Sequence, residues 1–88
     1  MRISHQQLVP VHVRSVTNAD GAILLDTNAG ILFSLNHVGG LIWERLRAGK
    51  SENEIARMLA ERFQISLDQA LKDIRSFSAE LRNKQLLL

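Results

Sequence analysis

Histidines and carboxylates are the side chains of this 88-residue sequence that would bind a metal ion or transfer a proton. The histidines, His5, His12 and His37, lie far apart, and no two have the four-residue spacing that places two imidazoles on one face of a helix. The acidic pair Glu52 and Glu54 stands where a helix is expected to begin, and negative charge is favourable there without any catalytic role. We therefore predict no metal site, no cofactor and no catalytic residue, and thus a protein that is not an enzyme.

A glycine pair follows a cap-forming residue within residues 36–40, a pattern similar to a phosphate-binding loop. The lysine of such a loop is missing. We expect instead that Asn36 caps a helix and that Gly39 and Gly40 let this helix approach a sheet closely. The single tryptophan, Trp43, is expected to pack at the core rather than to stack on a ligand.

The composition is that of an ordinary folded domain. Hydrophobic residues make up 45% of the chain, charged residues make up 23%, and the formal net charge is +2, which argues against a disordered protein. Cysteine is absent, so disulfides, thiolate metal sites and cysteine nucleophiles are excluded. No apolar stretch has the length of a membrane span or the position of a signal segment, and we predict a single cytoplasmic domain over residues 1–88.

The first part of the chain predicts a small antiparallel sheet. Residues 11–16 alternate apolar and polar side chains, as expected of a strand with one face in water. Residues 22–26 and 31–35 are apolar runs of strand length, and turn-forming residues at 17–21 and 27–30 separate the three segments.

Three helices are predicted to follow, beginning after Asn36, Ser51 and Ser66. Ser51 with Glu54 forms a Ser-x-x-Glu capping box, and Gly49 stands where the first helix should end. Apolar residues at helical spacing should face one core: Val38, Leu41, Ile42 and Leu46, then Ile55, Met58, Leu59 and Phe63, then Ala70, Leu71, Ile74, Phe77 and Leu81. The predicted fold class is α+β, winged-helix-like, with a three-stranded antiparallel sheet followed by three helices, and the apolar tail at residues 86–88 should pack beside the sheet or the third helix.

Winged-helix proteins commonly bind DNA through the third helix, so the charge of this helix decides between two functions. Its charged residues balance to zero: Asp68, Asp73 and Glu80 against Lys72, Arg75 and Arg82. Without a positive face, the counterion release that dominates DNA affinity is largely lost. DNA binding is therefore the alternative function, and a plain protein-interaction module is a further alternative.

The order and spacing of several segments resemble those of one protein family. The segments are Leu24-Leu25-Asp26, then residues 30–36, then Val38-Gly39-Gly40-Leu41-Ile42-Trp43-Glu44-Arg45-Leu46 and Gly49, with further matches to the apolar tail. This pattern resembles the family of pyrroloquinoline-quinone synthesis protein D, the precursor-peptide recognition element, over about residues 22–88.

The resemblance implies a domain that binds the leader segment of a ribosomally synthesised precursor peptide. In such proteins the leader adds an extra strand beside the third strand, next to the third helix, a mode known as β-augmentation. The matching positions here are Ile31, Leu32, Phe33, Ser34 and Leu35 on the strand, with Asp73, Ser76, Phe77 and Glu80 on the helix. Phe77 is also a candidate for the core.

Two turns separate this sequence from the quinone-pathway members of the family. Residues 27–30 stand in place of a Pro-Glu-Gly-like turn, and residues 47–49 in place of Cys-Asp-Gly. The turn at Leu25-Asp26 and the helix with Ile42-Trp43 are more similar to those of the standalone leader-binding proteins of lasso-peptide pathways. The implied partners are a precursor leader and a leader peptidase or other modifying enzyme, with no nucleic acid and no membrane. An open edge strand would also allow a homodimer, and a chaperone role in quinone synthesis remains an alternative.

Overall fold

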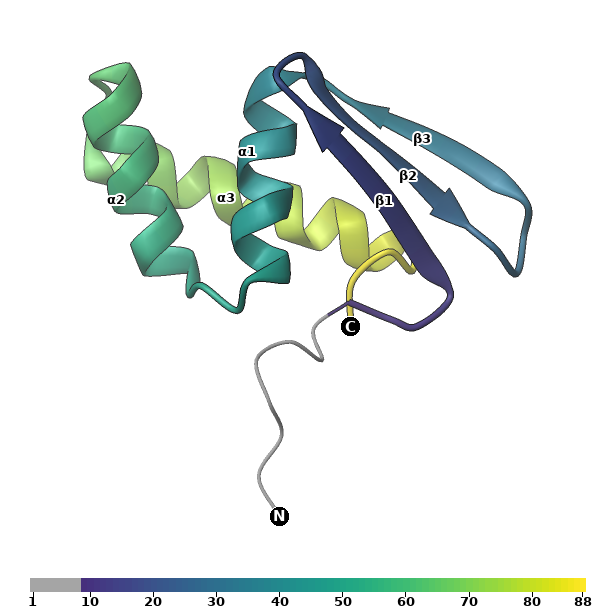
Figure 1. Ribbon diagram of the computed structural model, residues 1–88. Coiled ribbons are helices and arrows are strands. Elements are labelled where there is room, and N and C mark those ends of the chain that lie inside the picture. The colour runs from purple at the N-terminus through teal and green to yellow at the C-terminus, as the bar shows by residue number, and fades with distance from the viewer. Residues whose placement is uncertain (1–8) are drawn as a thin grey trace.

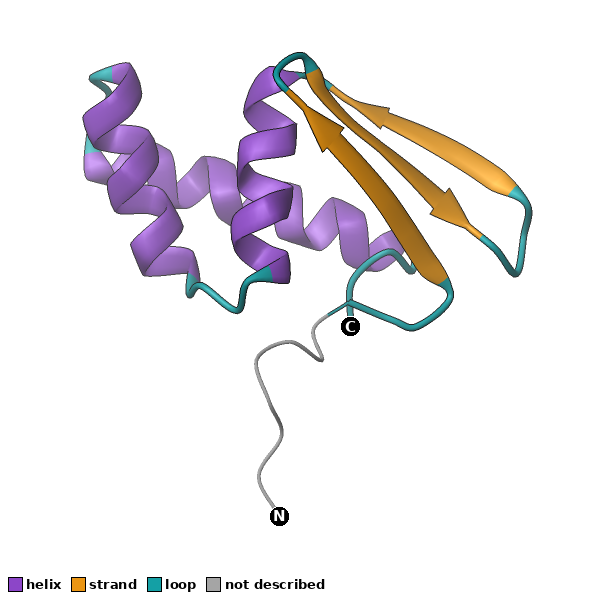
Figure 2. Cartoon of the chain, in the orientation of Figure 1, coloured by secondary structure: helices purple, strands orange, loops and turns teal. Residues whose placement is uncertain are grey.

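The computed structural model describes residues 9–88 as three strands followed by three helices (Figure 1). The strands are β1 (Val13–Asn18), β2 (Gly21–Asp26) and β3 (Ile31–Leu35), and the helices are α1 (His37–Arg47), α2 (Glu52–Phe63) and α3 (Leu67–Asn83). The sheet is antiparallel in the order β1-β2-β3, so β3 is an edge strand (Figure 2). The predicted α+β fold is confirmed; His5 lies outside the described residues.

The first strand begins and ends two residues later than predicted. Thr17 and Asn18, expected in a turn, pair with Ala22 and Gly21. The turn that remains has only two residues, and its geometry is fixed by the Asp20 N–H, which donates to the Asn18 side chain (2.8 Å). Cross-strand pairing therefore extends the strand into residues whose types favour turns.

The predicted helix starts are confirmed. Asn36 accepts a hydrogen bond from the Gly39 N–H (2.9 Å), and Ser66 accepts one from the Gln69 N–H (3.1 Å). Ser51 caps α2 with the complete reciprocal capping box predicted from the sequence. Each side chain satisfies a backbone donor that the helix itself leaves without a partner.

One hydrophobic core joins the sheet, the helices and the tail. Its largest fully buried side chains include Leu24, Trp43, Ile55, Ile74 and Leu86. The predicted packing of Trp43 is thus confirmed, and so is that of Leu86 and Leu87 in the apolar tail, whereas Leu88 is 63% exposed. Two predicted core positions are wrong: Val38 and Phe63 are exposed, because each lies at a helix end where the apolar stripe has turned away from the core.

The first helix packs tightly on the sheet through glycine, as predicted. A Cβ on Gly40 would lie 2.9 Å from the carbonyl carbon of Gly21, and a Cβ on Gly21 would lie 2.0 Å from the carbonyl oxygen of Leu35. No side chain fits at either position. This contact fixes the end of β3 against the start of α1, and therefore places β3 relative to the helices.

Candidate functional site

The edge strand β3 is the most exposed strand of the sheet. Leu32 is 67% exposed and Ile31 49%, Ser34 is also exposed, and Phe33 and Leu35 are half-buried against the core. Within residues 9–88, its only strand neighbour is β2. One side of β3 therefore carries backbone groups without a strand partner.

Hydrogen-bond direction alternates along a strand, so the register identifies the residues of β3 that face this free edge. The Thr27 N–H, just after β2, donates to the His12 carbonyl oxygen, just before β1 (2.9 Å). Odd-numbered residues of β2 therefore bond toward β1, and even-numbered residues, among them Leu24, bond toward β3. Leu24 is paired with Phe33. It follows that the N–H and C=O groups of Leu32 and Ser34 point away from β2, toward the free edge.

Side-chain direction alternates as well, and it divides β3 into two faces. Phe33 shares the face of its partner Leu24, which is fully buried. Ile31 and Leu35 point to that same inner face, whereas Leu32 and Ser34 point to the opposite, outer face together with the exposed Ile23. The inner face thus offers partly buried apolar side chains beside the free backbone edge.

On α3, Phe77 is a predicted site residue that lies beside the end of β3. It is half-buried. A Cβ built on Gly39 would lie 3.5 Å from the edge of the Phe77 ring and 3.2 Å from the Leu35 Cβ, so Gly39 lies beside both side chains. Both roles considered for Phe77 fit this position, since the ring packs on the core and keeps an exposed part. Two predicted site residues, Phe77 and Leu35, therefore both lie next to Gly39, near the start of α1.

The three polar candidates on α3 are all exposed. Asp73 accepts a hydrogen bond from the Gln69 amide (2.9 Å), and Glu80 forms an ion pair with Lys84 (3.7 Å). Successive residues turn by about 100° around a helix, so Asp73 and Glu80 lie on one side of Phe77, one turn before it and one turn after it, whereas Ser76 lies nearly opposite the buried Ile74. Ser76 is the predicted site residue farthest from the core face of the helix.

The other sheet edge, β1, is partly occupied by the protein itself. The Val13 N–H donates to the Pro10 carbonyl oxygen (3.1 Å), and the Thr17 hydroxyl donates to Glu44 of α1 (2.5 Å). Arg14 and Arg47 line a hollow of about 590 Å³ beside this strand. The β1 edge therefore has one of its outward backbone donors, the Val13 N–H, already bonded within the described chain.

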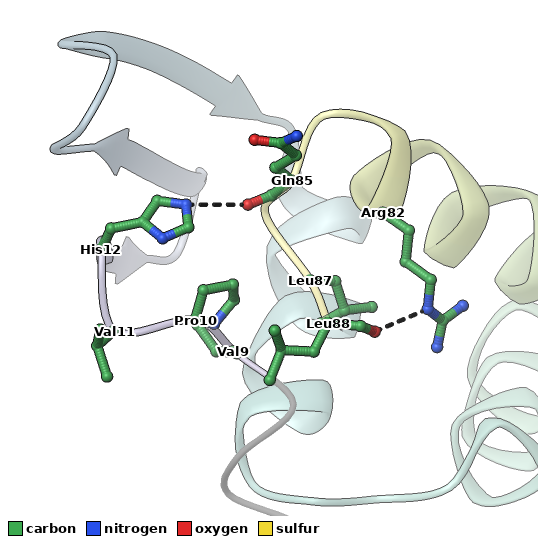
Figure 3. Close-up of a pocket in the computed structure, with 8 residues that line it drawn as sticks. All are labelled: Val9, Pro10, Val11, His12, Arg82, Gln85, Leu87 and Leu88. Carbon is green, nitrogen blue, oxygen red and sulfur yellow. Dashed lines mark hydrogen bonds between the residues drawn. The ribbon is translucent and has the colours of Figure 1, made fainter.

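A second hollow, of about 620 Å³, lies where the segment before β1 meets the C-terminal residues (Figure 3). The His12 Nε2 lies 3.2 Å from the Gln85 carbonyl oxygen, which accepts a hydrogen bond when Nε2 is protonated, and the Arg82 Nε donates to the Leu88 carbonyl oxygen (2.9 Å). None of these residues was predicted from the sequence to form a site. The first contact joins the segment before β1 to the C-terminal residues, and the second holds the tail against the end of α3; both are structural roles.

Among residues 9–88, no cluster of three or more His, Cys, Asp or Glu side chains is arranged to hold a metal ion. The helices of this same region include none that is long and apolar enough to cross a membrane.

Comparison with known proteins gives a family and two similar structures. The family model of coenzyme PQQ synthesis protein D matches residues 21–87. A solved structure described as TbiB1 in complex with the TbiA(beta) leader peptide is 31% identical, with a TM-score of 0.85 over 91% of this chain and 93% of that one. A second, described as lasso peptide synthetase B1 complexed with the leader peptide, is 25% identical, with a TM-score of 0.84 over 91% and 94% of the two chains.

No curated protein sequence matched. The family model covers most of the chain, and both similar structures agree with the fold over nearly its full length. The resemblance inferred from the sequence is therefore confirmed, and this chain belongs to the coenzyme PQQ synthesis protein D family.

Proposed function

We propose that this protein binds the leader segment of a ribosomally made precursor peptide as a fourth strand on β3, and delivers the precursor to a processing enzyme. The observation that carries the proposal is the free edge of β3, where the backbone groups of Leu32 and Ser34 point away from the sheet. Two similar proteins are described as bound to leader peptides, which supports the same ligand class here.

The added strand would form hydrogen bonds with Leu32 and Ser34, and these bonds are independent of the leader's sequence. Selectivity would come from side chains on the inner face. Phe33, Leu35 and Phe77 supply apolar contact, while Asp73 and Glu80 would select polar or basic leader side chains on the α3 side. Ile31 would extend the apolar contact at the start of the strand, and Ser76 would contribute least.

The role requires no catalytic residue. A protein that holds the leader while a partner enzyme acts raises the local concentration of precursor at that enzyme. We infer a leader peptidase of a lasso-peptide pathway as the partner, acting in the cytoplasm, because both similar structures carry leader peptides and one is named a lasso peptide synthetase component. The family match supports a second candidate, a peptide chaperone in quinone cofactor synthesis.

DNA binding is disfavoured by the charges of α3. Three acidic and three basic residues give the helix no net charge, and one of the cations, Arg75, lies 4.0 Å from Glu52 of α2. A recognition helix without a positive face gains little from phosphate contacts.

The test is a titration of the purified protein with a fluorescently labelled leader peptide from the same gene neighbourhood. A scrambled peptide, a leader from a quinone pathway and duplex DNA serve as controls. Saturable binding of the first leader alone is expected. Binding of DNA that weakens steeply with salt, without leader binding, would overturn the proposal.

The free edge would also allow two copies to pair strand to strand when no leader is present. Sedimentation with and without leader tests this homodimer: leader should convert any dimer to a monomer, because both ligands would use the same edge.

A further inference from the structure

The strand β1 forms the second edge of the sheet, and part of this edge is open. The register directs the backbone groups of even-numbered β1 residues toward β2, so those of Ser15 and Thr17 point away from the sheet. The Val13 N–H points the same way but is already bonded to Pro10. Ser15 and Thr17 therefore carry backbone groups that have no strand partner within residues 9–88.

The second half of α1 runs beside this open part of β1. Glu44 accepts a hydrogen bond from the Thr17 hydroxyl. Arg47, about one helical turn later, lines the hollow of about 590 Å³ together with Ser15 and Arg14. The Ser15 side chain is small and points to the inner face of the sheet, so space remains between the strand and the helix. The hollow has room for the inward side chains of an extended peptide.

Arginines stand on both faces of the sheet at this edge. Arg14 points to the outer face, where it is exposed, and Arg47 lines the hollow from the inner face. Residues 13–18 and 41–50 carry four basic side chains and one carboxylate: Arg14, Arg45, Arg47, Lys50 and Glu44. Since the carboxylate is ion-paired with Arg47 (3.1 Å), basic side chains remain in excess. The open edge is therefore positively charged.

The two sheet edges differ in the charge beside them. The polar candidates on α3 for the β3 site, Asp73 and Glu80, include both carboxylates proposed to select the leader, whereas Arg14 and Arg47 border the β1 edge. Charged residues on an open edge deter pairing with uncharged or like-charged strands. A basic edge is therefore selective for a strand of opposite charge. A second copy of the chain is a poor occupant, because pairing of two β1 edges would bring the arginines of both copies together.

We propose that the β1 edge is a second peptide-binding site, which takes an acidic segment in extended conformation as an added strand. The backbone of the segment would bond to Ser15 and Thr17, and its carboxylates on the two faces would meet Arg14 and Arg47. This inference goes beyond leader binding and does not depend on it. Because β1 and β3 lie on opposite sides of β2, both edges can be occupied at once.

The test uses the purified 88-residue chain and three synthetic probe peptides. The first alternates valine with glutamate, the second is its basic twin with lysine in place of each glutamate, and the third is the acidic probe with a proline at its centre. Backbone amide chemical shifts of the isotope-labelled protein identify the contacted strand without any variant. Fluorescence anisotropy at low and high salt gives the affinities.

The acidic probe is expected to shift the amides of Ser15 and Thr17 and to leave those of Leu32 and Ser34 unchanged. Its affinity should exceed that of the basic twin by about tenfold or more, and it should weaken as salt screens the arginines. The proline in the third probe should remove most of the binding, because it interrupts strand pairing. A saturating amount of leader peptide should not displace the acidic probe.

Variants separate the backbone from the charges. Ser15→Pro removes an edge donor and should lower the affinity for the acidic probe about tenfold or more, with Ser15→Ala as its matched control. Arg14→Gln and Arg47→Gln should each lower it about two- to fivefold. Arg62→Gln, which removes a cation from α2, should leave it unchanged. Leader affinity should keep its wild-type value in all these variants.

Equal affinity for the acidic and basic probes, binding of neither, or shifts confined to β3 would overturn the inference. A chain that sediments as a dimer without any peptide, and that Ser15→Pro converts to a monomer, would assign the edge to a second copy and overturn it as well. Leader binding is measured separately, so a wild-type protein that binds the acidic probe but no leader refutes the proposed function alone.

Discussion

Gly40 of α1 lies directly against the backbone of Gly21 in β2, with no room between them for a methyl group. A Cβ at residue 40 would meet main-chain atoms, which cannot rotate away as a side chain can. This contact brings the first helix onto the sheet. It also fixes the direction of β3, because Leu35, the last residue of β3, lies beside Gly21. The geometry of the proposed leader edge therefore depends on two residues that have no side chains.

Gly40→Ala should destabilise the fold even though alanine is the better helix former. Helix propensity favours alanine by about 1 kcal/mol, whereas overpacking costs about 1–3 kcal/mol, and here the cost falls at its upper end because the neighbour is backbone. We expect a net loss of about 1–2 kcal/mol in the free energy of unfolding, measured by urea denaturation. Gly39→Ala is the comparison, since its nearest contact is the Leu35 Cβ at 3.2 Å. Equal stability of Gly40→Ala and the wild type would contradict the close-packing argument.

Leu32→Pro should abolish most leader binding while leaving the sheet folded. The Leu32 N–H points to the free edge, so proline removes a donor that only the added strand would use. Loss of one buried hydrogen bond, with the steric cost of the ring, predicts a fall in leader affinity of about tenfold or more. Leu32→Ala shortens the side chain but keeps the N–H, and is the matched control.

Ser34→Pro should behave like Leu32→Pro, and Ser34→Ala like the wild type, because Ser34 is the other residue whose backbone faces the edge. Circular dichroism confirms that each variant is folded before its affinity is measured. Proline variants that bind as tightly as their alanine counterparts would show that the leader does not pair with β3.

Several features of the fold follow from local sequence, and others do not. Asn36, Ser51 and Ser66 were recognisable as helix caps because a cap needs only the residue and its neighbours three positions on. The limits of β1 were not recognisable, because Thr17 and Asn18 become strand only by pairing with β2. Non-local pairing is not encoded in the residue types of the strand itself.

Part of the candidate site was likewise predictable from local sequence, and part was not. The residues of β3 were predicted from an apolar run between two turns, and the strand begins and ends where predicted. That Leu32 and Ser34 face the free edge follows only from the register with β2. The outward direction of Val16 was missed for the same reason: the alternation of residues 11–16 breaks at Ser15, and the register alone places Val16 on the solvent side.

Ser51→Ala should destabilise α2 without changing leader binding. The Ser51 hydroxyl accepts from the Glu54 N–H (3.1 Å), and the Glu54 side chain accepts from the Ser51 N–H (2.9 Å). Removing a cap of this kind costs about 1 kcal/mol, seen as a lower urea midpoint. The helix lies away from β3, so a large loss of leader affinity in this variant would mean that α2 contributes to the site.

Phe77→Ala should reduce both stability and leader affinity, because the ring packs on the core and borders the proposed site beside Leu35. Truncating a half-buried phenylalanine is expected to cost about 1–3 kcal/mol of stability, less than for a fully buried ring. Ser76→Ala, one residue away on the outer side of α3, should change neither quantity. The informative measurement is leader affinity at a temperature where Phe77→Ala is fully folded: a drop confined to Phe77→Ala places the leader against the inner side of α3. Equal affinities in the two variants would remove α3 from the site and leave β3 as the sole contact.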